Sequence, residues 1–272
     1  MFFSRPDPQK IGLNRPKIKD GAYDAAYAFR GCLNAHISGG VFTGKYVFYG
    51  AKSPKIGGGE FQTDFSFYAA ENPQVSGGIF AGKMAFYGAL SPVVDNGDFC
   101  GEWAFCESQG VLIKAGQFSG SGAFSEAVKA TVHRGHSSGP DFGITSRQMV
   151  ITGGTFTVSG LLKFSQSALV LGGEIIGPAS FEEAQNIRVL LDGTIPEIRN
   201  PLSGIIAAKK IGRIVFDKEK PSDVIIVAES VNEGASYADR ITAGCIPSPP
   251  TDPNQALKLL QELAAAINSG QS

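Results

Sequence analysis

The 272-residue sequence has few charges and almost no imbalance between them. Lys and Arg number 24 and Asp and Glu 25, so charged residues make up 18% of the chain and the formal net charge is −1. A chain without a basic excess has no electrostatic footprint for nucleic acid and no polybasic contact for a membrane surface. We therefore expect no nucleic-acid partner.

Long apolar runs and an export signal are also missing. No stretch approaches 18 apolar residues, and the opening MFFSRPDPQK lacks the apolar run of a signal peptide. The four cysteines, Cys32, Cys100, Cys106 and Cys245, form no CxxC pair and are too sparse for a disulfide scaffold. We expect a cytoplasmic protein with reduced thiols and no membrane span. Export by a dedicated secretion system would leave no mark in such a sequence.

Glycine is abundant, at 35 residues, and its positions reveal a repeat of 19 residues. One glycine column comprises Gly21, Gly40, Gly59, Gly78, Gly97, Gly116, Gly135, Gly154 and Gly173, and Gly193 and Gly212 continue it after a one-residue slip. A β-branched column comprises Ile37, Ile56, Val75, Val94, Ile113, Val132, Ile151, Val170 and Val189. Two further columns are mostly phenylalanine, with Phe42, Phe61, Phe80, Phe99 and Phe118 in one and Phe48, Phe67, Phe86, Phe105 and Phe124 in the other.

Such columns, with turn glycines between them and no helix-length segment, predict short strands that coil and stack on one another. Within one coil the apolar points are Ile56, Phe61, Phe65 and Phe67, and the intervals between points are unequal. A left-handed hexapeptide helix needs equal faces, so the pattern favours a right-handed parallel β-helix. The prediction is an all-β solenoid of about ten coils, each with three short faces, in which 23 of the glycines occupy three corners.

Four segments are expected along the chain. Residues 1–19 form an N-terminal cap, 20–230 the solenoid, 231–253 a proline-rich linker and 254–272 a C-terminal α-helix. Strand-like sequence continues past the regular coils, at 214–216 and 223–228. The helix either caps the last coil or docks a partner, since a solenoid exposes unpaired strand edges at its ends.

The coil pattern resembles the right-handed parallel β-helix superfamily that contains pectate lyases and polygalacturonases. The resemblance covers residues 20–216 and is architectural, because no catalytic or calcium-binding motif of those families aligns with this sequence. It implies a fold and leaves the chemistry open.

Acidic residues offer one candidate site. Glu60 and Asp98 share a column with Glu174, and neighbouring coils can bring two carboxyl groups to the separation that glycoside hydrolysis needs. A different column reads Lys45, Asp64, Lys83, Glu102, alternating in sign. At about 4.8 Å between coils this column predicts a surface ladder of ion pairs. We expect no catalytic residue, no metal site and no cofactor.

One coil breaks the phenylalanine columns, with Ser137 and Gly143 in place of the aromatic residues. It also carries His133 and His136, an HxxH pair that lacks a third ligand at a defined spacing and is a weak zinc signal. A surface loop that bulges from the stack and a functional site are the two interpretations of residues 133–147.

A column of tyrosines is the strongest binding candidate. Tyr49, Tyr68 and Tyr87 each follow an inward phenylalanine by one residue, so strand alternation turns them outward. Stacked exposed aromatic rings bind a sugar polymer, a flat ligand or a partner protein, and they also serve simply to shield a corner.

Two functions follow from these patterns. The first is a non-catalytic scaffold or interaction protein that binds a protein partner or assembles with itself through the solenoid ends or the C-terminal helix. It is similar to bactofilin-like polymers in being a short-coil solenoid without a signal. The alternative is a polysaccharide-binding or polysaccharide-cleaving protein, a lyase or glycoside hydrolase, acting as a secreted effector or phage component.

Overall fold

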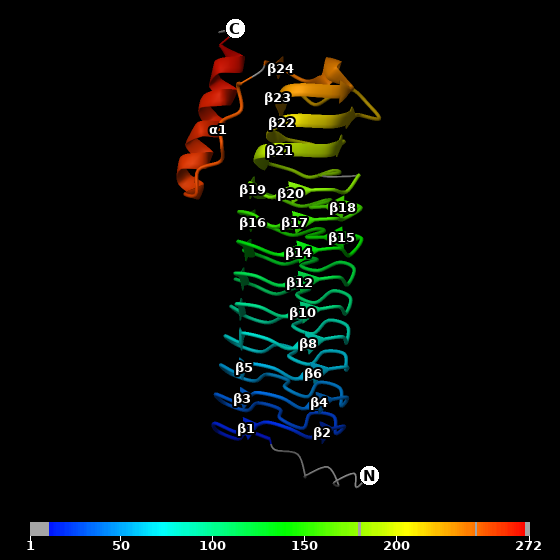
Figure 1. The fold of residues 1–272 in the computed structure, drawn as a ribbon, viewed down its shortest axis with the longest axis vertical. Helices are drawn as coiled ribbons and strands as arrows, with labels where there is room; N and C mark the ends of the chain where they lie inside the picture. Colours follow the sequence, from blue (N-terminus) through cyan, green and yellow to red (C-terminus); the bar gives the residue numbers. More distant parts are fainter. Residues whose placement is uncertain (1–10, 179–180, 243, 270–272) are drawn as a thin grey trace.

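The structure, a computed structural model, describes residues 11–178, 181–242 and 244–269 and is a β-solenoid of about 11 turns (Figure 1). Parallel strands on one side form a thirteen-stranded sheet: β1 (Lys17–Ile18), β3 (His36–Ile37), β5 (Lys55–Ile56), β7 (Gln74–Val75), β9 (Val93–Val94), β11 (Leu112–Ile113), β13 (Thr131–Val132), β16 (Val150–Ile151), β19 (Leu169–Leu171), β21 (Ile187–Arg199), β22 (Gly204–Val215), β23 (Val224–Glu233) and β24 (Arg240–Ile241).

A second, nine-stranded sheet runs beside the first. It contains β2 (Ala22–Tyr23), β4 (Val41–Phe42), β6 (Glu60–Phe61), β8 (Ile79–Phe80), β10 (Asp98–Phe99), β12 (Gln117–Phe118), β14 (His136–Ser137), β17 (Thr155–Phe156) and β20 (Glu174–Ile175). The remaining elements are the strand pair β15 (Asp141–Phe142) and β18 (Gly160–Leu161), a 3₁₀ turn at Ala235–Tyr237 and the helix α1 (Pro253–Asn268).

The register confirms the 19-residue repeat. Ile37 pairs with Ile56, and Phe42 pairs with Phe61, so each column of the sequence becomes a stack of identical positions. The buried rings stack in parallel along each phenylalanine column, with centroids 4.7 Å apart for Phe42 and Phe61 and 4.8 Å apart for Phe48 and Phe67. Between the two columns the rings meet edge to face, and these contacts fill the interior of the rod.

The third side of each regular coil is an arc of turns with hydrogen bonds of its own. In the sheets an N–H donates to the preceding coil, as Gly57 does to the Ile37 carbonyl at 2.8 Å. In the arc the direction reverses, and the N–H of Phe48 donates to the Ser66 carbonyl of the following coil at 2.8 Å. The backbone is therefore paired between coils on all three sides of the regular repeat.

Several corner glycines are explained by close contact between coils. A Cβ added at Gly101 would lie 1.9 Å from the carbonyl oxygen of Gly82 in the coil before it. No side chain fits there unless the backbone shifts, whereas Thr63 occupies the equivalent position two coils earlier.

The last coils depart from the predicted pattern. Strands β21, β22 and β23 are 13, 12 and 10 residues long, whereas most strands of the regular coils have two. The expectation that Gly193 and Gly212 continue the corner glycines is wrong, because they lie inside β21 and β22. The register shift between Leu191 and Thr194 shows that Gly193 sits at a bulge, where a strand bends without ending.

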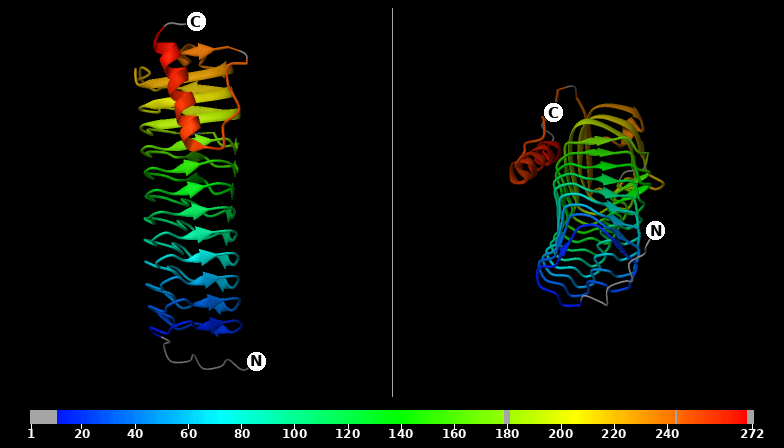
Figure 2. Two further views of the ribbon diagram at one scale, coloured as in Figure 1. Left: turned by 90° about the vertical axis from the view of Figure 1, so that its left-hand side faces the viewer. Right: turned by 60° about the horizontal axis from the view of Figure 1, so that its bottom comes forward.

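The C-terminal helix lies along the side of the last coils and not across the end of the rod (Figures 1 and 2). Asp252 caps its N-terminus by accepting a hydrogen bond from the N–H of Asn254 at 3.0 Å. Ala256 and Leu260 are buried against Leu169, Leu171 and Leu190 on the outer face of the thirteen-stranded sheet. The segment before the helix is also hydrogen-bonded to the sheet, since the Ser248 hydroxyl donates to the Asp192 carboxylate at 2.9 Å.

Two segment limits differ from those expected. Asn14 bridges to Leu33 and Lys17 pairs with His36, so part of the expected cap already belongs to the first coil. Residues 1–10 lie outside the described residues. Within the expected linker, β24 pairs with β23, and the helix begins at Pro253. No helix in the described part of the chain is long and apolar enough to span a membrane.

Candidate functional site

The tyrosine column forms on the arc as predicted. Tyr49, Tyr68 and Tyr87 are half-buried, and successive rings stack with centroids 5.2 and 5.3 Å apart. Their planes are nearly parallel, at 9° and 10°, because each ring belongs to the same position of consecutive coils.

A second outward column lies beside the first and was missed by the sequence reasoning. It consists of Tyr27, Tyr46, Phe65, Met84 and Trp103, with Tyr27 and Tyr46 stacked at 5.2 Å and Tyr46 and Phe65 at 5.0 Å. Edge-to-face contacts join the two columns, as between Tyr46 and Tyr68 at 5.9 Å. Phe65, one of the apolar points of the repeat, lies in this column with its ring half-exposed. We call the eight side chains of the two columns the aromatic strip.

The second column of the strip, which we call its outer column, is held in a costly backbone conformation. Tyr27, Tyr46, Phe65, Met84 and Trp103 all have φ between 54° and 59°. A left-handed conformation costs a residue with a side chain roughly 1–2 kcal/mol relative to its ordinary one. Glycine would avoid this cost, and Gly122 occupies the same position in the next coil with φ of 68°. The chain therefore retains large side chains where glycine would be favoured locally.

Charged groups close both ends of the tyrosine column. The Arg30 guanidinium lies 5.3 Å from the centroid of the Tyr49 ring. At the other end the Tyr87 hydroxyl donates to the Glu107 carboxylate, and this hydrogen bond raises the pKa of Tyr87. Tyr87 therefore stays protonated and its hydroxyl keeps one direction.

The predicted ion ladder borders the strip. Lys45 lies 3.9 Å from Asp64, and Lys83 lies 2.8 Å from Glu102. The hydrogen bond and charge of Glu102 raise the pKa of Lys83, whose ammonium also lies 5.9 Å from the Trp103 ring centroid. The ladder fixes alternating charges along one edge of the strip.

Glu60 and Asp98 do not share a cleft with the tyrosines. They lie on the outer face of the nine-stranded sheet, on β6 and β10, with Ile79 of β8 between them. With Asp20 they line a shallow cavity of about 590 Å³ whose other walls are mostly glycine backbone. Two coils separate the carboxyl groups, a distance of about 9.6 Å along the stack. The binding role expected for these two residues stays a prediction.

The irregular coil repacks its core, and its two histidines lie at the surface. Ser137 is buried and donates to the Phe118 carbonyl at 3.4 Å, while Phe142 occupies the space that Gly143 leaves. His133 contacts the Thr152 hydroxyl at 2.9 Å, and both His133 and His136 are exposed. Among the described residues no group of three or more His, Cys, Asp or Glu side chains is placed to hold a metal ion.

The cysteines are free thiols in the structure. Burial raises the pKa of Cys32 to about 12, and burial together with nearby glutamates raises the pKa of Cys106 to about 11. Both are therefore protonated and unreactive near neutral pH. Cys106 follows Tyr87 in the tyrosine column and is buried there.

Comparison with known proteins places the chain in a family. Residues 85–227, just over half of the chain, match the family described as Protein of unknown function (DUF3737). The chain belongs to this family. The matched part begins inside the aromatic strip and extends through the irregular coil into β23, so it includes both the regular and the widened coils of this DUF3737 protein. No curated protein and no solved structure matches the chain.

Proposed function

We propose that the protein is a non-catalytic scaffold that self-associates side by side through the aromatic strip. The observation that carries the proposal is a strip of large, half-exposed side chains whose outer column keeps them in a left-handed backbone conformation. Residues that break a local conformational preference are expected at functional positions.

The orientation of the rings favours a protein surface over a sugar. A pyranose packs against the face of an aromatic ring, but the faces within each column of the strip are taken by the rings above and below. The edges and hydroxyl groups remain for a partner. Tyrosine and arginine are enriched in the cores of protein interfaces, and stacked rings lose little conformational entropy on binding.

A second copy of the chain fits the charges beside the strip. Lys45, Asp64, Lys83 and Glu102 alternate from positive to negative. When two such ladders are placed antiparallel, Lys45 faces Glu102 of the second copy and Asp64 faces its Lys83. A two-fold axis between the second and third charges therefore makes this edge self-complementary, as a symmetric dimer requires.

The five coils of the strip extend over about 19 Å along the rod. Aromatic columns at the centre and charged residues at the rim correspond to the usual anatomy of a protein interface. The apolar face of the C-terminal helix packs on its own sheet, so the helix is a weaker candidate for association than the arc.

Sedimentation and light scattering of the full chain test the proposal. We expect a concentration-dependent dimer whose dissociation constant rises at least tenfold in Tyr46→Ser/Trp103→Ser. A matched control, Gln74→Ser/Gln117→Ser, changes two side chains on the outer faces of the sheets and should leave association unchanged. A chain that stays monomeric at every concentration would overturn self-association.

Charge reversal tests the antiparallel arrangement separately. Asp64→Lys/Glu102→Lys makes the ladder entirely positive, and Lys45→Glu/Lys83→Glu makes it entirely negative. Each variant alone should be monomeric, and an equimolar mixture should form the mixed dimer. If both variants associate with themselves like the parent chain, the ladder takes no part in the interface.

The polysaccharide alternative is tested by a screen of neutral and acidic glycans. Binding by the parent chain that is lost in Tyr68→Ser would replace the scaffold proposal with a carbohydrate-binding one.

We also infer a right-handed winding, as the unequal faces indicate, since parallel connections within one sheet are right-handed in nearly all proteins. That hand would place the fold with the pectate-lyase-like β-helices.

A further inference from the structure

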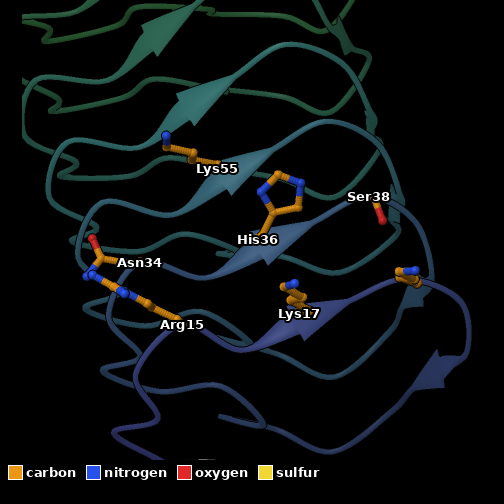
Figure 3. A pocket seen from close by; sticks show the side chains of 7 residues that line it. Arg15, Lys17, Asn34, His36, Ser38 and Lys55 are labelled. Carbon is orange, nitrogen blue, oxygen red and sulfur yellow. The ribbon is translucent and has the colours of Figure 1, made fainter.

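Positive charge is concentrated at the N-terminal end of the thirteen-stranded sheet. Five basic side chains line a cavity of about 620 Å³ on its outer face, namely Arg15, Lys17, Lys19, His36 and Lys55. Asn34 and Ser38 complete the lining, which contains no acidic residue. Figure 3 shows His36 standing between Lys17 and Lys55 on successive strands.

The basic residues are stacked in register. Lys17 pairs with His36 and His36 pairs with Lys55, so two ammonium groups lie two coils apart with an imidazole between them. Other columns stack opposite charges, as in Lys52 with Glu71 at 3.1 Å and Lys114 with Asp95 at 2.8 Å.

In the part of the chain that the structure describes, the basic side chains of this cavity lack acidic partners. All five are exposed. Within the described residues Arg15, Lys17, Lys19 and Lys55 form no ion pair. A bound anion would contact several cations at once.

The extent of the basic surface limits the size of the ligand. Three consecutive coils carry it, a length of about 10 Å along the rod. The next positions of the same column are Gln74 and Val93, which carry no charge. A long polyanion would extend past the basic groups, whereas a compact anion with several negative charges fits within them.

The donors favour phosphate groups. Arginine binds phosphate oxygens with a planar fork of N–H groups, and lysine contributes a mobile point charge with three donors. Asn34 and Ser38 add neutral donors at the two sides of the cavity. We propose that this cavity binds a compact ligand carrying two or more phosphate groups.

Isothermal titration of the full chain with tripolyphosphate at low salt tests the proposal. We expect binding that Lys17→Gln/Lys55→Gln weakens at least tenfold. The matched control is Lys52→Gln/Lys114→Gln, which removes the same net charge from paired lysines outside the cavity. Equal weakening by both double variants would mean an effect of net charge alone and would overturn the site.

Further probes define the ligand class. Citrate carries comparable charge on carboxylates, and equal binding of citrate would overturn the preference for phosphate. A single-stranded oligonucleotide series whose affinity rises with length beyond the span of the cavity would overturn a compact ligand in favour of a polymer. Lys17→Gln/Lys55→Gln should also unfold at a temperature no lower than the parent, because neither lysine forms an ion pair with a described residue. A lower unfolding temperature would point to a structural role for the two lysines.

Discussion

At the scale of single residues, the irregular coil shows how the core tolerates a break in its pattern. In the coil before it Ala123 and Phe124 occupy two adjacent core positions, and in the irregular coil Phe142 and Gly143 occupy them. The large and small side chains have exchanged places. A Cβ at Gly143 would lie 2.8 Å from the Leu162 side chain, because that side chain has moved into the vacated space.

This exchange predicts a compensating pair of substitutions. Phe142→Ala should lower the free energy of unfolding by about 3 to 5 kcal/mol, since it leaves a cavity beside Phe118 and Phe124. Phe142→Ala/Gly143→Phe restores the order of the preceding coil and should recover part of the loss. Phenylalanine tolerates the left-handed backbone here, as Phe124 does with φ of 64°. Chemical denaturation of both variants checks this, and a double variant no more stable than Phe142→Ala would contradict it.

The same residues mark what could be foreseen from the sequence. The phenylalanine columns, the corner glycines and the tyrosine column follow from the 19-residue spacing, because stacking converts sequence identity into spatial contact. The spacing does not say which way a residue in a tight turn points. Phe65 is an apolar point of the repeat like Phe61 and Phe67, but its left-handed backbone turns it outward. The basic stack was likewise hidden, because Lys17, His36 and Lys55 become a cluster only once the first coil is known to begin before residue 17.

At the scale of elements, the helix covers the part of the sheet that widens. Strands β21 to β23 present Leu190, Ala207 and Val227 outward, and these residues are buried under α1. The proline-rich segment and the helix were predictable from local signals. The surface on which the helix packs was not predictable. The apolar outer face of the long strands is recognised only once Gly193 and Gly212 are known to lie within strands.

The packing of α1 predicts the effect of detaching it. Leu260→Asp buries a carboxylate against Leu169 and Leu190 and should release the helix, because an unpaired charge is costly in an apolar contact. We expect stronger binding of a hydrophobic dye and faster proteolysis near residues 247–252. Gln261→Asp introduces the same group at the adjacent exposed position and should change neither. A Leu260→Asp chain that binds no more dye than the parent would show that the helix is dispensable for covering the sheet.

At the scale of the whole molecule, stability is expected to be uneven along the rod. Each coil of a solenoid contacts its neighbours only, so local opening depends on the local ladder and its cover. The C-terminal coils have long strands under a helix, whereas the N-terminal coils have two-residue strands and a stack of basic groups.

Hydrogen exchange followed by mass spectrometry should therefore show a gradient. Amides of β21 and β22 should exchange most slowly and those of β1 and β3 most quickly, with the regular coils between them. Because a ligand bound at the N-terminal cavity stabilises the coils that hold it, tripolyphosphate should slow exchange in residues 14–38 and leave β21 and β22 unchanged. Uniform exchange along the rod would contradict the nearest-neighbour description. Slowing by tripolyphosphate at both ends alike would contradict a local effect at the N-terminal cavity.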